Sequence, residues 1–192
     1  RLVPFYNIFF VITIAAVGTI FLILGLMVLV RRRNDKAALV FHLAMNCVAI
    51  MIMATAGSHN VPPYGIGWGV AIVYTTAYTF LPFLFFHFTL LFPSEKWTSR
   101  KRVMSFLYGV ATILSLWLAT TFILGIVSPS RAFWVSLLIR AFVLCQWLFI
   151  IGSVVSLGSL VQTYLSTQDQ VERIRLRWLL AGASVAPLAF IL

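Results

Sequence analysis

The sequence predicts an all-α fold, a polytopic transmembrane helix bundle, on the basis of three observations. Of the 192 residues, 62% are hydrophobic and only 9% are charged, whereas soluble domains carry roughly a quarter of charged residues. The apolar residues form long runs, each near the ~20 residues that a membrane-spanning helix requires. The basic residues concentrate in every second loop between these runs, a pattern typical of membrane proteins.

Six apolar runs define the expected spans, which together make up a single transmembrane domain. We place these spans at 4–30, 37–56, 68–92, 103–127, 132–165 and 176–192, and we expect the arginine-rich residues 166–177 to form a polar linker between the last two. As a helix, the last run would rise about 25 Å, less than the ~30 Å hydrocarbon core. We therefore expect the sixth span to be truncated and the sequence to be a fragment of a longer chain.

The basic residues predict the orientation of the chain. Most of the 14 lysines and arginines follow spans one, three and five. By the positive-inside rule these loops are cytoplasmic, which leaves the N-terminus outside. Anionic lipid of the cytoplasmic leaflet is then the expected partner of the basic residues, and no nucleic acid is needed to explain the net charge of +10. The expected headgroup contacts are Arg31, Arg32, Arg33, Arg100, Lys101 and Arg102.

The acidic residues disfavour an ion pump or a cation symporter. All 4 of them fall in the same loops as the basic residues, whereas pumps and ion-coupled transporters place carboxylates within the membrane. A channel or transporter is therefore only a third hypothesis. The sequence also contains no phosphate-binding glycine loop, metal-spaced cysteine cluster or zincin helix. We assign no catalytic residue, and any enzymatic activity would belong to sequence beyond Leu192.

The third span contains a proline at membrane depth. Pro82 lacks an N–H group, so the carbonyl of Tyr78 loses its helical hydrogen bond. We expect the hydroxyls of Thr75 and Thr79 to replace that bond. Tyr74 and Tyr78 share one side of the helix. This polar notch is either a satisfied proline kink or a ligand site that includes Tyr78.

Two histidines lie at similar depth, each about one turn from the cytoplasmic side. His42 belongs to the second span, where Asn46 shares its face, and His87 belongs to the third. Three interpretations stay open. The pair could ligate haem iron or the magnesium of a chlorin, one histidine could titrate and bias helix packing, or each could make an ordinary interhelical hydrogen bond. Outside the first interpretation we expect no metal and no cofactor.

Polar and small residues on the remaining spans give further candidates. Arg140 lies in the fifth run, followed by Gln146. An arginine at that depth either extends toward the outer interface or pairs with an anionic headgroup or partner subunit. Small residues such as Gly25 and Gly152 allow close helix approach. We expect such faces to pack helices together, and homo- or hetero-oligomers to form through them.

Two stretches resemble the polytopic membrane regions of bacterial signalling receptors. They are His87-Phe88-Thr89-Leu90-Leu91-Phe92-Pro93 and Arg173-Ile174-Arg175-Leu176-Arg177-Trp178-Leu179-Leu180-Ala181-Gly182, which are similar to segments of ComP-like sensor histidine kinases and their relatives with phosphatase or cyclase outputs. The resemblance implies a multi-helix input domain of the bacterial cytoplasmic membrane, placed ahead of a cytoplasmic effector.

Two functional hypotheses follow. The first is a non-catalytic sensory module whose helix packing responds to a ligand or to the bilayer, with residues 162–177 relaying the change. The second is a non-catalytic accessory subunit of a larger membrane complex, photosynthetic or respiratory, that packs against or holds chlorin, haem, carotenoid or lipid. The 17 phenylalanines and the depth-matched His42 and His87 motivate the second hypothesis.

Overall fold

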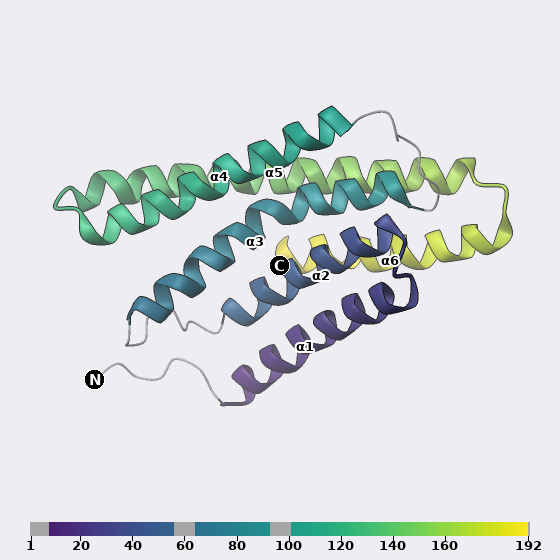
Figure 1. Cartoon of the computed structure of the whole chain (residues 1–192), viewed down its shortest axis with the longest axis horizontal. Helices are drawn as coiled ribbons and strands as arrows, with labels where there is room; N and C mark the ends of the chain where they lie inside the picture. The colour runs from purple at the N-terminus through teal and green to yellow at the C-terminus, as the bar shows by residue number, and fades with distance from the viewer. Residues whose placement is uncertain (1–7, 56–63, 93–100, 192) are drawn as a thin grey trace.

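The computed structural model describes residues 8–55, 64–92 and 101–191, with side chains given for 8–55, 67–92 and 101–181. Every regular element in these ranges is an α-helix, which confirms the predicted all-α class (Figure 1). The helices are α1 (Ile8–Arg31), α2 (Lys36–Ala54), α3 (Tyr64–Leu91), α4 (Lys101–Val127), α5 (Arg131–Ser166) and α6 (Gln170–Ile191).

Five helices of the described chain are long and apolar enough to cross a membrane. They are α1, α2, residues Gly67–Leu91 of α3, α4 and α5. Large apolar side chains remain exposed along α1, α4 and α5, an arrangement that water would disfavour and lipid tails accept. The chain is therefore an integral membrane protein.

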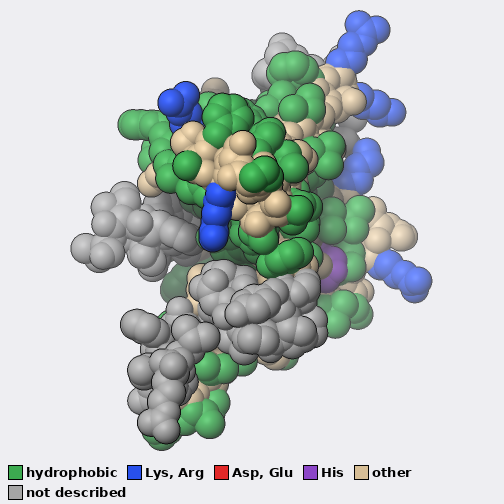
Figure 2. Space-filling view, turned by 90° about the vertical axis from the view of Figure 1, so that its left-hand side faces the viewer, with side chains coloured by type: hydrophobic (Ala, Val, Ile, Leu, Met, Phe, Trp, Pro, Cys, Tyr) green, Lys and Arg blue, Asp and Glu red, His purple; other side chains and the backbone are tan. Residues whose placement is uncertain are grey.

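Successive helices run in opposite directions along the bundle (Figure 1). The end of α1, the start of α2, the end of α3, the start of α4 and the α5–α6 turn all lie at one end of it. We call this the basic end, because its described basic residues are Arg31, Arg32, Arg33, Lys36, Lys101, Arg102, Arg173, Arg175 and Arg177. Figure 2 looks from the opposite end. Its described surface is mainly hydrophobic, with a few lysine or arginine side chains and no acidic side chain in view.

Aspartates cap the N-termini of α2 and α6, two helices that start at the basic end. The Asp35 carboxylate accepts the N–H of Ala37 at 2.8 Å, and Asp169 accepts the N–H of Val171 at 2.9 Å. Such caps satisfy backbone donors that a helix start leaves unpaired. Asp35 and Asp169 therefore have a local structural role at this end.

The start of α6 differs from the sequence-based expectation. We expected a polar linker over 166–177 and a span from 176, but α6 already begins at Gln170. Charged residues are good helix formers when their side chains point into solvent, and the Asp169 cap provides the start signal. Of the expected linker, only 167–169 lies outside a helix. The proposed truncation of the sixth span concerns residues beyond Ala181, whose side chains lie outside the described set.

Helix α3 occupies the centre of the bundle, since it packs against α2, α4 and α5. One apolar cluster joins α2 to α3, around Ala44, Met51 and Leu84. A second cluster joins α4 to α5, around Leu118 and Ala141. Tyr78 packs against both clusters, so this residue of α3 lies where the two halves of the bundle meet.

Glycines form the contact between α1 and α2. The only buried residues of α1 among those described are Gly18 and Gly25. A Cβ added at Gly18 would lie 2.6 Å from the Cγ of Met53, and one added at Gly25 would lie 3.0 Å from the Cβ of Met45. A methionine side chain can rotate away from Gly18. The Cβ of Met45 is fixed to the backbone, so the contact at Gly25 has less freedom to adjust.

We predict that Gly25→Ala destabilises the bundle by about 1–3 kcal/mol, because the added methyl group overpacks the α1–α2 contact. The free energy of unfolding in mixed micelles, followed by circular dichroism, measures the effect. Gly109→Ala is the matched control, because a Cβ there meets nothing within 4 Å. Equal stability of the two variants would contradict this account of the contact.

Candidate functional site

The threonines near Pro82 do not act as the sequence suggested. Thr75 donates to the carbonyl of Ile72 at 2.9 Å, and Thr79 donates to that of Thr76 at 2.9 Å. The expectation that they bond to the Tyr78 carbonyl was wrong. A threonine hydroxyl reaches back to the carbonyl three or four residues earlier, so only a side chain after Tyr78 could reach that carbonyl.

The proline kink instead provides a close contact between helices. A Cβ added at Gly152 of α5 would lie 3.0 Å from the Cβ of Pro82. One turn later, Ser156 is fully buried and donates to the carbonyl of Gly152 at 2.6 Å. The packing role predicted for Gly152 is confirmed, since the small residue lets α5 approach α3 at the kink.

Tyr78 is the centre of an aromatic cluster, which we call the tyrosine stack, made of Tyr74, Tyr78, Phe142 and Phe149. The rings of Tyr78 and Phe149 are nearly parallel, with centroids 5.7 Å apart, and the Tyr74 ring stacks on Tyr78 at 6.2 Å. Phe142 meets Tyr78 at 6.2 Å in a tilted geometry. The stack therefore joins α3 to α5 one turn before the Pro82–Gly152 contact.

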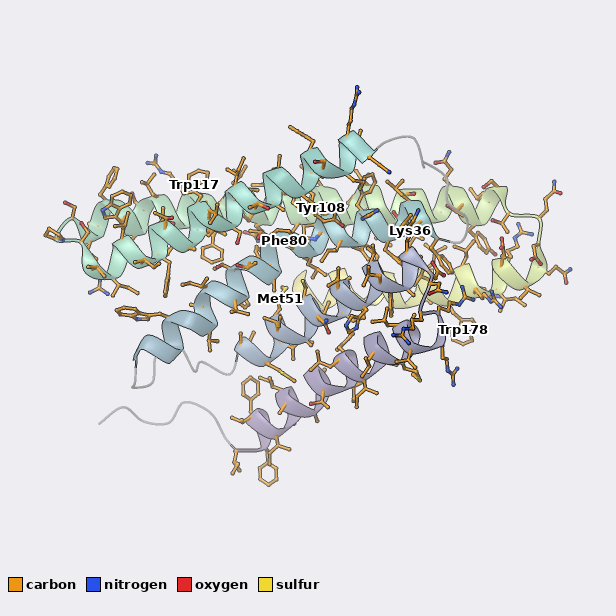
Figure 3. All side chains as sticks on the ribbon, viewed as in Figure 1. Lys36, Met51, Phe80, Tyr108, Trp117 and Trp178 are labelled. Atoms are coloured by element: carbon orange, nitrogen blue, oxygen red, sulfur yellow. The ribbon has the colours of Figure 1, made fainter. Side chains whose placement is uncertain are left out.

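Two side-chain hydrogen bonds join α3 to α4. Nδ1 of His87 lies 2.7 Å from the hydroxyl of Tyr108, and the hydroxyls of Thr76 and Ser115 lie 2.9 Å apart. Figure 3 shows Tyr108 beside Phe80 of α3, with ring centroids 6.3 Å apart. Neither Tyr108 nor Ser115 was among the candidate residues predicted from the sequence. Their seven-residue spacing, two helical turns, places both on one face of α4 and was the available signal.

His42 faces the other side of the bundle. Its Nε2 lies 3.1 Å from Nδ2 of Asn46, so the predicted proximity of these two residues is present within α2. Nδ1 of His42 is buried without a hydrogen-bond partner, 3.1 Å from where a Cβ on Gly25 would lie. His42 therefore points toward α1, whereas His87 points toward α4. Their sequence neighbours Phe41 and Phe88 make the α2–α3 ring contact, with centroids 5.4 Å apart.

The remaining candidate residues lie away from this central region. Arg140 and Gln146 are exposed on α5, and Arg140 makes no ion pair with any described residue. At the basic end, Arg32 approaches Asp35 at 3.4 Å between two partly exposed side chains. Arg31, Arg33, Lys101 and Arg102 are exposed there, and Arg100 lies outside the described residues. Tyr78 and His87 thus both lie on the central helix α3, whereas the described arginines lie on the surface.

The central helix contacts are suited to transmitting a displacement. Helix α3 is joined to α5 by the tyrosine stack and the Pro82–Gly152 contact, and to α4 by two hydrogen bonds.

In the described part of the chain, no three His, Cys, Asp or Glu residues come together as metal ligands. Comparison with protein-family models, with curated proteins and with solved structures finds no match to this chain.

We predict that Tyr108→Phe lowers the free energy of unfolding by about 0.6 kcal/mol, the typical value of an interhelical hydrogen bond in a membrane protein. A double-mutant cycle with His87→Ala measures the bond itself. We expect a coupling energy of similar size between the two substitutions. Strictly additive effects would show that His87 and Tyr108 stabilise the bundle independently.

Proposed function

We propose that this chain is the membrane-embedded, non-catalytic input module of a bacterial signalling receptor. The observation that carries the proposal is the length and position of α5, a helix of 36 residues. It would rise about 54 Å, well beyond a ~30 Å hydrocarbon core. Figure 1 shows its turn into α6 extending beyond the ends of α1 and α3. A single rigid element therefore connects the bundle interior with the space past its basic end.

The signal would enter through α3. This helix packs against three neighbours, so a ligand or a change in the bilayer that displaces it also changes their contacts. The tyrosine stack and the Pro82–Gly152 contact are so close that, when α3 moves, α5 must either move with it or repack against it. Packed interfaces of this kind tend to switch between discrete arrangements.

The hairpin of α5 and α6 would relay the change. Leu160 of α5 and Leu176 of α6 are both fully buried. The guanidinium of Arg173 lies 5.2 Å from the ring centroid of Tyr164, within the range of a cation–π contact. These contacts support movement of the two helices as one unit. The relay predicted for 162–177 thus consists of two packed helix ends and a short turn.

The proposed location is the bacterial cytoplasmic membrane, with the N-terminus outside. The described arginines and lysines gather at the basic end, apart from Arg131 and Arg140 on α5. Because cytoplasmic loops are enriched in these residues, we assign the basic end to the cytoplasm. The anionic leaflet there is the proposed partner of Arg31, Arg32 and Arg33. The resemblance to ComP-like receptors supports an effector that follows in the chain. Because α6 runs away from the basic end, a cytoplasmic effector would require a further span before it.

The decisive experiment uses the full reading frame, reconstituted in vesicles, with autophosphorylation or cyclase activity as the readout. We predict that Gly152→Leu changes the basal activity severalfold, because the side chain separates α5 from Pro82. Gly158→Leu is the matched control on the same helix, since a Cβ there meets nothing within 4 Å. A reading frame without an effector domain, or equal activities of the two variants, would contradict the proposal.

The accessory-subunit hypothesis stays a second proposal. The observation in its favour is the hydrogen bond between Nδ1 of His87 and Tyr108, because a histidine ligand commonly holds its second ring nitrogen in such a bond. His42 would not join it as a second ligand without rearrangement, since its imidazole faces Gly25. An absorption spectrum of the purified protein, before and after addition of haem or chlorin, tests this hypothesis. A spectrum without a bound-cofactor band in both samples would contradict it.

A further inference from the structure

The first turns of α6 have two apolar faces, of which only one is packed against the bundle. Leu176 is fully buried, and Leu179 packs against the cluster between α2 and α3. On the other side, Val171, Ile174 and Trp178 are 56%, 58% and 76% exposed. Their spacing of three and four residues puts them on one face of the helix. We call these three residues the α6 stripe.

Arginines border the α6 stripe. At 3.6 residues per turn, Arg175 lies on one side of the stripe and Arg177 on the other, while Leu176 lies almost opposite it. Both arginines are exposed. An apolar stripe between arginines is the pattern of a helix face that contacts the boundary between lipid headgroups and acyl chains. Tryptophan is itself enriched at that boundary.

The position of the α6 stripe fits the same boundary. Figure 3 shows Trp178 at the same end of the bundle as Lys36, the first residue of α2. The five apolar helices run from this end into the bundle. Trp178 of the stripe therefore lies where the apolar surface of the protein gives way to its basic residues.

Charge decides between a lipid surface and a second copy of the chain. The described basic end carries nine basic residues, named above, against three acidic ones, Asp35, Asp169 and Glu172. A symmetric contact between two copies through the stripe would bring Arg175 and Arg177 of each copy close together. Like charges that meet in an apolar contact oppose association. An anionic phospholipid layer provides the complementary charge.

We propose that the α6 stripe, with Arg175 and Arg177, is a binding surface for anionic phospholipids. The apolar side chains contact the upper acyl chains, and the two guanidinium groups bind headgroup phosphates with the bidentate geometry that arginine favours. This surface is distinct from the α1 and α4 arginines that the sequence indicated as headgroup contacts. It also stands independently of a signalling function, because it requires only the bilayer.

The experiment follows Trp178 in the full chain, reconstituted in phosphatidylcholine vesicles with or without phosphatidylglycerol. Subtracting the emission spectrum of Trp178→Phe from that of the wild type isolates this tryptophan from the other five. With phosphatidylglycerol we expect a blue shift, protection from aqueous acrylamide and quenching by phospholipids with brominated acyl chains. High salt should weaken each effect, because it screens the attraction between arginine and headgroup.

Two double variants with the same net charge test whether the effect comes from the two arginines beside the α6 stripe or from the positive charge of the basic end as a whole. Acrylamide quenching gives the ratio of lipid-shielded to water-exposed Trp178. Arg175→Gln with Arg177→Gln should lower this ratio about thirtyfold, which corresponds to about 1 kcal/mol for each basic residue near an anionic surface. Arg31→Gln with Arg33→Gln removes the same charge at the same end and should leave the ratio nearly unchanged. Circular dichroism confirms that both variants retain their helices.

Three results would overturn the proposal. The first is equal acrylamide quenching of Trp178 with and without phosphatidylglycerol. The second is an equal response of the two double variants. The third is shielding that depends on the protein-to-lipid ratio and coincides with a disulfide between copies of Ile174→Cys in a cysteine-free background, because this would identify a second copy of the chain as the occupant.

Discussion

Close backbone approach at a few small residues holds this bundle together, and the reason lies in the solvent. Lipid tails are as apolar as leucine side chains, so burying an apolar side chain between helices gains little over leaving it in lipid. Dispersion contacts must then supply the attraction, and they require helices that touch closely. Gly25 lets α1 approach His42 and Met45, while Gly152 lets α5 approach Pro82. The exposed apolar surface of α1 and α5 is the normal surface of a protein in this solvent.

Polar groups at membrane depth are mostly paired with other parts of the chain, and this shapes the functional interpretation. His87 is paired with Tyr108 and Thr76 with Ser115, both across the α3–α4 contact. Thr75 and Thr79 are paired with carbonyls of their own helix. Because an unpaired polar group in hydrocarbon is costly, these bonds specify helix partners more than they provide binding chemistry. Among the buried side-chain nitrogen and oxygen atoms of the described residues, the exception is Nδ1 of His42, which lies against α1 without a partner.

The charged residues divide into two kinds of role. The aspartates at the basic end are helix caps, since Asp35 and Asp169 each accept a backbone N–H two residues ahead. The arginines mostly remain exposed, available to whatever lies outside the bundle. At this end, Asp35 and Asp169 therefore start helices, while most of the described arginines keep their guanidinium groups on the surface.

The sequence by itself determined the features that depend on composition and on the lengths and spacing of the apolar runs along the chain. Long apolar runs fixed the number and approximate limits of the helices α1–α5, because only a helix satisfies its own backbone in lipid. The distribution of lysine and arginine indicated which ends belong together. The role of Gly152 could also be anticipated, since small residues are informative in any membrane helix. The early start of α6 was missed, because charged residues were taken as a linker although they form helices readily.

Only the tertiary structure decided which residues meet. Depth along a span can be counted from the sequence, but the direction in which a side chain points around the helix axis depends on how each helix is rotated in the bundle. His42 and His87 have similar depth, yet one faces α1 and the other faces α4. Tyr108 and Pro82 likewise acquired their partners only through packing. In lipid, apolar periodicity barely distinguishes a buried face from an exposed one. Helix rotation is therefore weakly encoded in sequence pattern and is set by the fit of small residues and polar pairs.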